Sequence, residues 1–521
     1  MFQSLNRSNV HEYYEIIDDK TLSFKDRVLL LYGNEVNSIN QLASIDLDDK
    51  YISGFKNTID EIIRKQSKVL IVSDYDCDGI CALVIMLRMF EYLKVKVNYY
   101  IPSREKEGYG ISAKIVKMAK DYRFDMIITL DNGIVALEAI ELANQYNIDM
   151  MIIDHHKFSE LPNVKTIIHP DLLDEYHHAM CTGGLMYVLS RSFYHDDYSL
   201  VLAMMATMGD VCEVKNANRY ILTEGLKAIN KDIAQTYPIM KLMKKNGPYT
   251  YDDISFNIIP KINAISRMDH MTNVNIIPKF LNDFDHHNLN TLNQIEEINQ
   301  LRKAISNECA NRLASRQFDD DLVLIYEEDL IEGLCGLIAN NLVNKIKKPV
   351  IVLTKSNGLI KGSARSIDGF DLHACLKAYH DFFVSFGGHK KAVGLSLQEE
   401  KLDSFKEMIK NTRVDVEVEK TKCVLISEDD LTFENLDFIK SLEPFGEGLN
   451  EPLLYLDNPK IIYKFMIKNL YPKYTLSSKV EAISFDSNMN YDDIKAMIGH
   501  AKIQFYNNKA KINFSIKQIV I

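Results

Sequence analysis

Short apolar runs that end in polar residues and alternate with helical patterns constrain the fold of this chain most strongly. Four such runs have the length and composition of buried strands. They are KVLIVSD (68–74), VKVNYYI (95–101), DMIITL (125–130) and IDMMIID (148–154). Strands that alternate with helices predict an α/β fold with a parallel sheet, in which functional residues gather just past the carboxyl ends of the strands.

The rest of the chain predicts further domains around this sheet. A helical pattern without Pro or Gly over 286–317 indicates a connecting helix. Strand-like runs follow it, and many short ones at the C-terminal end indicate a small barrel. We therefore predict an N-terminal helical segment (1–66), a catalytic domain (67–282), a connecting helix (283–317), a smaller α/β domain (318–412) and a C-terminal barrel (413–521).

Composition argues against a membrane protein and favours a reducing compartment. The chain is 46% hydrophobic and 26% charged, which is ordinary for a soluble protein, and no apolar run approaches the ~20 residues that span a bilayer. The first residues lack the pattern of a signal peptide, and the eight cysteines form no CxxC pair. We therefore expect free thiols and a cytoplasmic protein. The net charge of −11 argues only weakly against nucleic acid, because a basic groove can lie on an acidic protein.

An aspartate-rich segment follows the first strand. Because side chains alternate along an extended chain, Asp74, Asp76 and Asp78 share one face, and Gly79 then lets the chain turn into a helix. Carboxylates that crowd together repel one another unless cations neutralise them. The segment therefore predicts a metal site, and a solvated acidic turn is the alternative for this motif alone.

Three further motifs strengthen the metal interpretation. TLDNGI (129–134) and DHH (154–156) end the third and fourth strands, and MGD (208–210) follows an apolar helical run. Alone, Asp-Asn-Gly is typical of a turn, and paired histidines also occur elsewhere in the chain. Successive parallel strands end at one edge, so the motifs converge. Carboxylates with an imidazole suit Mn²⁺ or Mg²⁺ better than zinc, and a pair of such ions is a standard device for phosphoester hydrolysis.

These motifs resemble the DHH phosphoesterase superfamily, and within it the RecJ-type single-strand-specific exonucleases. The resemblance runs from residue 66 to 454. Besides the metal motifs it rests on IPSREKEGYGIS, IPKINAISRM, INQLRKAI, KGSARSIDGFDL, FGGHKKAVGLSL and LEPFGEGLNEP. It implies a DHH catalytic domain, a DHHA1 substrate-binding domain and an OB-like (oligonucleotide/oligosaccharide-binding) domain.

The resemblance also implies roles for individual residues. The implied metal ligands are Asp74, Asp76, Asp78, Asp131, His155 and Asp210. The implied catalytic residues are Asp131 as a ligand, His156 as proton donor or phosphate contact, and Asp154, which orients a histidine. The implied phosphate-binding residues are Arg104, Arg267, Ser363, Arg365, Gly387, Gly388 and His389. Departures from the family pattern at Lys261, His169 and Ile265-Ser266 concern substrate contacts rather than the metal site.

Two basic segments favour DNA binding on chemical grounds. Glycines in GSAR (362–365) and GGHKK (387–391) allow backbone N–H groups to approach a phosphate, and residues 355–394 carry six Lys or Arg against three Asp. A loop with solvated lysines is the alternative for GGHKK. Residues 458–479 hold five lysines, interleaved aromatic rings and no acidic residue, a mixture that suits single strands. An ordinary hairpin with buried aromatic rings is the alternative there.

The implied function is a single-stranded-DNA-specific 5′–3′ exonuclease that uses two divalent ions, Mn²⁺ or Mg²⁺, in DNA repair and recombination. The resemblance implies a monomer, names a single-strand-binding protein or a helicase as candidate partners, and predicts that the fourth domain of some members is absent. Two rival functions stay open. One is a DHH phosphodiesterase for short oligoribonucleotides or cyclic dinucleotides, which typically lacks the third domain. The other is a non-catalytic replication accessory protein, which loses metal ligands.

Overall fold

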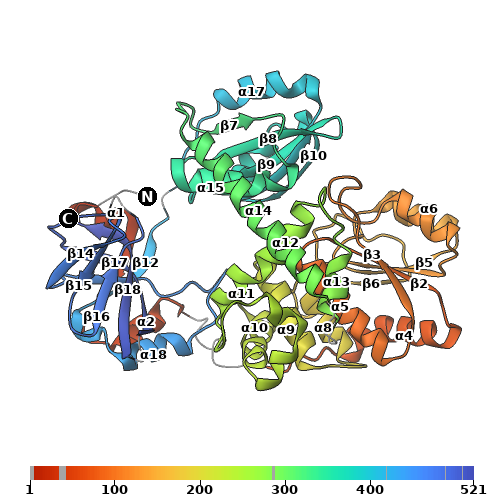
Figure 1. Cartoon of the computed structure of the whole chain (residues 1–521), viewed down its shortest axis with the longest axis horizontal. Helices are drawn as coiled ribbons and strands as arrows, with labels where there is room; N and C mark the ends of the chain where they lie inside the picture. The colour runs from red at the N-terminus through yellow and green to blue at the C-terminus, as the bar shows by residue number, and fades with distance from the viewer. Residues whose placement is uncertain (1–4, 34–42, 284–287, 418, 487–488, 507–508) are drawn as a thin grey trace. The chain divides into compact units, whose positions relative to one another are not determined.

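The computed structural model describes residues 5–33, 43–283, 288–417, 419–486, 489–506 and 509–521. The chain divides into two compact units (Figure 1). One comprises residues 43–415, and the other joins residues 1–42 to residues 416–521. None of the helices in the described ranges is long and apolar enough to cross a bilayer.

A five-stranded parallel sheet forms the core of the larger unit. In spatial order its strands are β3 (Val97–Tyr100), β2 (Val69–Ser73), β4 (Met126–Leu130), β5 (Asp149–Ile153) and β6 (Thr166–Ile168). The four predicted strands are confirmed, and β6 is an addition whose three residues are too few to show a pattern. Every residue of β2 and β4 is buried, because helices cover both faces of the sheet.

Helices pack on both faces of this sheet, and further helices pack behind those of one face. They are α4 (Asp49–Lys65), α5 (Cys77–Tyr92), α6 (Ala113–Asp121), α7 (Leu137–Gln145), α8 (Thr182–Ser190), α9 (Asp197–Gly209), α10 (Asn216–Ile229), α11 (Tyr251–Asn257), α12 (Ile259–Arg267) and α13 (Ile276–Leu281). The apolar faces of α6 and α7 join one cluster with side chains from β2, β4 and β5. Helices α5, α8 and α9 pack together on the other face (Figure 1), so α5 runs directly from the end of β2 into the core.

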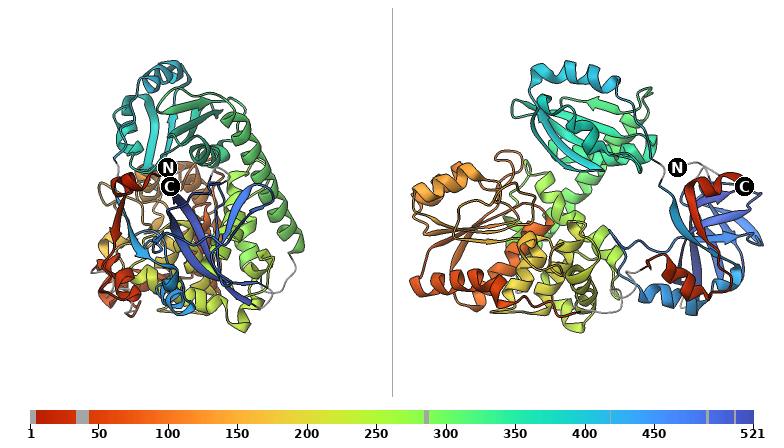
Figure 2. Two further views of the ribbon diagram at one scale, coloured as in Figure 1. Left: turned by 90° about the vertical axis from the view of Figure 1, so that its left-hand side faces the viewer. Right: turned by 180° about the vertical axis from the view of Figure 1, so that it is seen from behind.

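The predicted connecting helix is confirmed as α14 (Leu289–Ala314). It leads to a second sheet with the order β10 (Phe383–His389), β11 (Ala392–Leu397), β9 (Leu359–Arg365), β8 (Val350–Ser356) and β7 (Val323–Tyr326). Helices α15 (Cys335–Ile346), α16 (Leu372–Lys377) and α17 (Leu402–Lys410) cover it, with α15 and α17 on opposite faces (Figure 2). GGHKK, for which a loop was the alternative, begins inside strand β10, since Gly387, Gly388 and His389 pair with β11.

The smaller unit is built on an eight-stranded sheet. Its order is β1 (Tyr14–Ile17), β12 (Thr421–Ile426), β13 (Leu454–Asp457), β17 (Ala496–Tyr506), β18 (Lys509–Val520), β16 (Val480–Ile483), β15 (Tyr471–Thr475) and β14 (Tyr463–Ile467). Helices α1 (Val10–Tyr13), α2 (Phe24–Leu30) and α18 (Phe433–Ser441) accompany it. Within the described residues the outer strands β1 and β14 do not pair with each other, so the predicted small barrel is an open, strand-rich sheet.

The N-terminal segment contains helices, as expected for residues 1–66, and also the strand β1, which the helical expectation missed. Strand β1 pairs in parallel with β12, with Tyr14 opposite Thr421, and Tyr14 packs with Cys423 and Tyr455. A short strand whose partner lies at the far end of the chain carries no local signal, because its pairing partner and burial decide its conformation. Residues 1–4 and 34–42 of this prediction lie outside the described part of the chain.

Candidate active site

Polar motifs at the carboxyl ends of β2, β4 and β5 converge on one edge of the parallel sheet. Asp74 follows β2, Asp131 follows β4, and DHH (154–156) follows β5, and these three strands are neighbours in the order β2-β4-β5. Helix ends supply the remaining carboxylates. Three groups of ligand atoms within 4.8 Å of one another result: Asp74–Asp76–Asp131, Asp78–His155–Asp210 and Asp131–His155–His156.

Backbone N–H groups hold the carboxylates of the aspartate-rich segment. Asp76 caps α5 and accepts hydrogen bonds from the amides of Asp78 (2.9 Å) and Gly79 (3.2 Å). The buried carboxylate of Asp78 accepts from the amides of Thr182 (2.9 Å) and Gly183 (2.6 Å) at the start of α8. A Cβ atom at Gly79 would lie 2.7 Å from the carbonyl oxygen of Asp74, so only glycine permits this turn.

Asp131 lies at the centre of the cluster. It belongs to two of the three groups of ligand atoms, and its Oδ1 lies 3.2 Å from His155 Nε2. Its backbone has a φ of +62°, a left-handed conformation that non-glycine residues rarely adopt and that often marks functional sites. The chain therefore turns sharply at the end of β4 and directs this carboxylate into the cluster.

The two histidines of DHH have different surroundings. His155 lies among the carboxylates, with Nε2 3.7 Å from Asp78 Oδ2 and Nδ1 3.7 Å from Asp210 Oδ2. His156 Nδ1 lies 2.8 Å from Asp154 Oδ1, and Asp154 also accepts from the amides of both histidines and of Ile134. Asp154 thus fixes the loop that carries both imidazoles.

The carboxylate cluster is electrostatically unfavourable without cations. Burial and then like-charged neighbours raise the pKa of Asp74 and Asp131; the largest effect of a neighbouring charge comes from Asp76 on Asp74 and from Asp78 on Asp131. Burial also raises the pKa of Asp76, Asp78 and Asp210. Asp74 Oδ1 is buried and accepts no hydrogen bond from the described residues. Carboxylate oxygens with an imidazole are the donors that suit Mn²⁺ and Mg²⁺, so these residues fit divalent ions.

Arginines gather beside the carboxylates. Burial and the charges of Arg104, Arg302 and Arg365 lower the pKa of Arg267 to about 10, and burial and Arg104 lower the pKa of Arg365. Within the described residues these four arginines form no ion pair with a carboxylate. Half-buried cations without a counter-ion are costly, so this arginine cluster (104, 267, 302 and 365) has the chemistry to receive an anion. The guanidinium of Arg104 also lies 5.3 Å from the Tyr75 ring centre.

The second sheet brings the other predicted phosphate-binding residues into register. Gly387 pairs with Gly394, which pairs with Ser363, and His389 pairs with Ala392, which pairs with Arg365. Directly opposite residues project from the same face, as do alternate residues along a strand. Ser363, Arg365 and His389 therefore project from the same face of the second sheet. On the intervening strand β11, the residues opposite them are the small Gly394 and Ala392. Gly388 has a φ of +138°, which restricts this position to glycine.

Several contacts of the site carry little sequence signal. Thr182 Oγ1 lies 3.2 Å from Asp131 Oδ1, and Asp269 accepts from Ser103 Oγ (2.7 Å) and the Glu105 amide (3.0 Å), which flank Arg104. Arg302 lies on the connecting helix, where a basic residue resembles an ordinary solvated side chain, yet its Nε is buried without a hydrogen-bond partner among the described residues. Tyr109, in the EGYG part of IPSREKEGYGIS, contacts His156.

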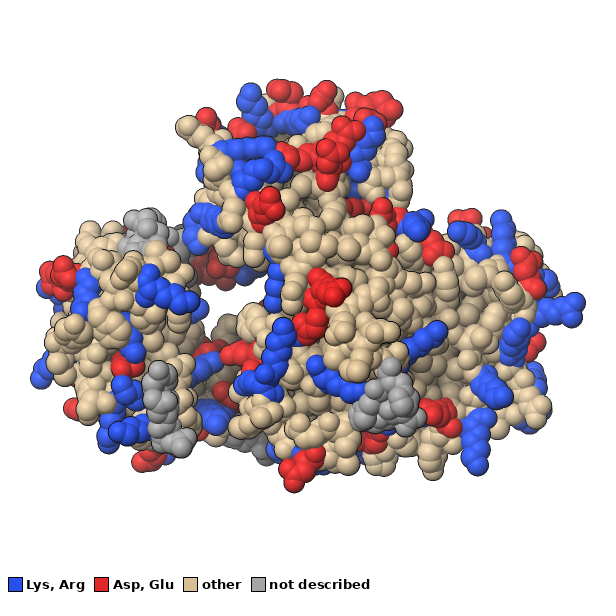
Figure 3. All heavy atoms as spheres, in the orientation of Figure 1, with Lys and Arg blue, Asp and Glu red and all other residues tan. Residues whose placement is uncertain are grey.

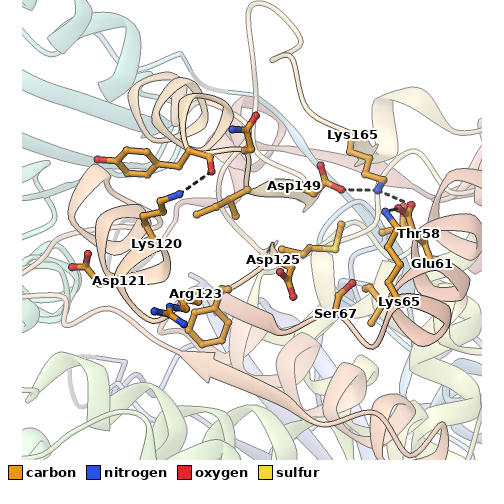
Figure 4. A pocket seen from close by; sticks show the side chains of 16 residues that line it. Thr58, Glu61, Lys65, Ser67, Lys120, Asp121, Arg123, Asp125, Asp149 and Lys165 are labelled. Carbon is orange, nitrogen blue, oxygen red and sulfur yellow. Dashed lines mark hydrogen bonds and ion pairs between the residues drawn. The ribbon is translucent and has the colours of Figure 1, made fainter.

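A cavity of about 750 Å³ lies at the opposite, amino-terminal edge of the parallel sheet (Figure 4). Its polar groups satisfy one another: Lys165 pairs with Glu61 (2.6 Å) and Asp149 (2.7 Å), and Lys120 donates to the Tyr146 carbonyl (3.4 Å). The perturbed carboxylates lie at the other edge, so we place the chemistry there despite the size of this cavity.

Comparison with known proteins identifies the domains of the chain. The family model "DHH family, N-terminal domain" matches residues 68–209, the DHHA1 domain matches residues 319–413, and the RecJ OB domain matches residues 424–518. The chain thus carries the domains of a DHH-type protein together with a DHHA1 domain and a RecJ OB domain. Over these ranges it is similar to RecJ-type proteins.

Relatives and solved structures are similar over much of the chain. The single-stranded-DNA-specific exonuclease RecJ of Bacillus subtilis is 27% identical over 505 residues, which is 90% of this chain and 64% of that protein. The RecJ of Haemophilus influenzae is 26% identical over 76% of each chain. The chain thus spans less than two thirds of the Bacillus relative. A crystal structure of RecJ from Thermus thermophilus in complex with Mn²⁺ has a TM-score of 0.80 at 19% identity, covering 95% of this chain and 75% of that one.

Proposed function

We propose that this chain is a single-stranded-DNA-specific exonuclease that hydrolyses phosphodiesters with two bound Mn²⁺ or Mg²⁺ ions, in the 5′ to 3′ direction, and acts in DNA repair and recombination. The observation that carries the proposal is the convergence of buried carboxylates and histidines beside arginines that lack counter-ions among the described residues. Relatives named as single-stranded-DNA-specific exonucleases support the substrate.

The groups of ligand atoms suggest how two ions are held. Asp74, Asp76 and Asp131 would hold one, and Asp78, His155 and Asp210 the other, with Asp131 shared because it belongs to two groups and lies beside His155. Bound divalent ions activate water and stabilise charge on a phosphate. The protein contributes a rigid arrangement in which backbone amides fix Asp76 and Asp78.

His156 acts as the proton donor or phosphate contact in this proposal. Burial lowers its pKa, but the hydrogen bond and charge of Asp154 outweigh burial and raise the pKa to about 9. The protonated imidazole is thus favoured by its bond to Asp154, which orients the ring through Nδ1. The other ring nitrogen is left for the substrate.

The arginine cluster, Ser363, Gly387, Gly388 and His389 bind strand phosphates in this proposal. Arginine forms bidentate bonds with phosphate, and glycines next to Ser363 leave room for a backbone to approach. The net charge of −11 is compatible with phosphate binding, because a protein's net charge does not set the charge of each part of its surface. On the face shown in Figure 3, Lys and Arg side chains lie among the Asp and Glu side chains.

The smaller unit contributes aromatic contacts more than charge. Two of the five lysines at 458–479 are neutralised by the fold, since Lys464 pairs with Asp492 (2.6 Å) and Lys473 with Glu481 (2.6 Å). On β14, Tyr463 and Phe465 are exposed, and their rings stack with centroids 6.0 Å apart. Exposed stacked rings suit the bases of a single strand.

The deciding experiment compares substrates in the presence of Mn²⁺. We expect release of mononucleotides from long single-stranded DNA and little from duplex DNA, with release starting at the 5′ end of end-labelled strands. Preference for dinucleotides over long strands would favour the phosphodiesterase, and absence of any hydrolysis would favour the accessory protein. The same proposal includes a monomeric state, which sedimentation tests, and a single-strand-binding protein or helicase as partner, which pull-down tests. It also includes a cytoplasmic location.

A further inference from the structure

The carboxylate of Asp269 ties together two segments that carry arginines of the site. Its Oδ2 accepts one hydrogen bond from Ser103 Oγ (2.7 Å) and another from the main-chain amide of Glu105 (3.0 Å). These two residues flank Arg104 in the loop between β3 and α6. Asp269 itself comes shortly after Arg267, the last residue of α12. One carboxylate oxygen therefore joins the loop of Arg104 to the end of the helix that carries Arg267.

The same loop is also folded on itself around Ser103. The Ser103 hydroxyl accepts from the amide of Lys106 (3.1 Å), and the Ser103 carbonyl accepts from the amide of Glu107 (2.9 Å). A hydroxyl has one proton and can accept as well, so Ser103 donates to Asp269 and receives from Lys106 at the same time. The bonds inside the loop give it its shape, and the bonds to Asp269 set where Arg104 lies relative to α12.

A tie of this kind is needed because the arginines repel one another. After burial, the charge of Arg104 has the largest effect in lowering the pKa of Arg267, to about 10. Arg104 also has the largest effect, after burial, in lowering the pKa of Arg365. A loop that carries one of several repelling cations tends to move away from the others. The bonds from Asp269 to both neighbours of Arg104 oppose that movement.

We infer that Asp269 is a positioning residue for substrate binding: it holds Arg104 beside Arg267 before the DNA strand arrives. Groups that are already in place lose less conformational freedom on binding, and affinity rises accordingly. Once a phosphate is bound, its own negative charge keeps the arginines together. Asp269 therefore acts on binding and has little effect on the chemical step. This inference rests on the proposed function, in which the arginine cluster binds strand phosphates.

The test measures kcat and KM for a long single-stranded oligonucleotide with Mn²⁺. Because a charged side chain must then be ordered on binding, Asp269→Ala is expected to raise KM roughly 3- to 10-fold with kcat nearly unchanged. Asp269→Asn should stay close to the wild type, since its side-chain oxygen can still accept both bonds. In an Arg104→Ala background, Asp269→Ala should raise KM no further, because the residue that it positions is gone.

Two further measurements separate positioning from a general loss of structure. Ser103→Ala removes one of the two bonds from the other side and should raise KM in the same direction, which keeps the test decisive if Asp269→Ala folds poorly. The rise in unfolding temperature on adding Mn²⁺ alone should be the same in Asp269→Ala and in the wild type, because the metal ligands are untouched.

Asp253→Ala is the matched control. Asp253 Oδ2 also accepts from a hydroxyl and from an amide, both of Thr250 and both at 2.8 Å, at the start of α11. Its replacement should lower stability and leave KM unchanged. Wild-type KM in Asp269→Ala and Ser103→Ala, or an equal further rise of KM in the Arg104→Ala background, overturns the inference and leaves the proposed function standing. If the wild type does not degrade single-stranded DNA, the proposed function itself fails.

Discussion

Replacing Asp131 by Asn makes the metal-free protein more stable and removes its activity. Carboxylate oxygens of Asp131, Asp74 and Asp76 lie within 4.8 Å of one another. At an effective dielectric constant of about 20, two unit charges at that distance repel by about 3.5 kcal/mol. Protonation of the cluster relieves part of this repulsion, so we expect a net gain of about 2 kcal/mol in the free energy of unfolding. Asn keeps the shape and tolerates the φ of +62° better than Ala.

The assay is unfolding of the metal-free protein at pH 8 in EDTA, followed by nucleotide release with Mn²⁺. Asp121→Asn is the control, because Asp121 is exposed at the end of α6 and its replacement should change neither measurement. Lower stability of Asp131→Asn in EDTA would contradict the electrostatic reasoning. Retained Mn²⁺-dependent hydrolysis would refute the assignment of Asp131 as a ligand.

Three other predictions follow from the same geometry. His156→Ala is expected to lower kcat by about 10²–10⁴-fold while Mn²⁺ still raises the unfolding temperature; loss of that metal response would move His156 into the ligand set. Because burial and like charges raise the pKa of Asp74 and Asp131, the folded metal-free protein binds more protons than the unfolded chain. The contribution of these carboxyl groups to stability is therefore fully present below the ordinary carboxyl pKa and is lost as pH rises through the raised pKa values. Saturating Mn²⁺ should flatten this pH dependence. A stability that instead rises with pH over this range would refute the electrostatic reasoning. The double variant Tyr463→Ala and Phe465→Ala is expected to weaken binding to long single strands by at least about tenfold, because base stacking contributes ~1–3 kcal/mol per base. The salt dependence of binding should change little. Unchanged affinity in the folded variant would remove β14 from the binding surface.

Much of the catalytic domain could be predicted because its signals are local. Apolar runs such as DMIITL are buried on both faces and therefore stand out without a partner, and the aspartates and histidines directly follow them. Parallel neighbours end at one edge, so convergence of Asp74, Asp131 and DHH (154–156) follows from chain order alone.

Long-range contacts set the limit of prediction. The lysines at 458–479 have no acidic residue within their segment, but the sheet brings Glu481 to Lys473 and a loop brings Asp492 to Lys464. Strand β1 takes its conformation from β12. Arg302 joins the arginine cluster only because α14 places it near Arg267.

In the proposed function, two divalent ions bind this cluster and both are required for hydrolysis. Counting bound Mn²⁺ per chain by equilibrium dialysis, with nucleotide release from single-stranded DNA measured on the same samples, tests it most directly. We expect activity to rise only as the second ion binds, and Asp131→Asn to lose both activity and tight binding of that ion. Full activity with one bound ion, or with none, would rule out a two-ion mechanism.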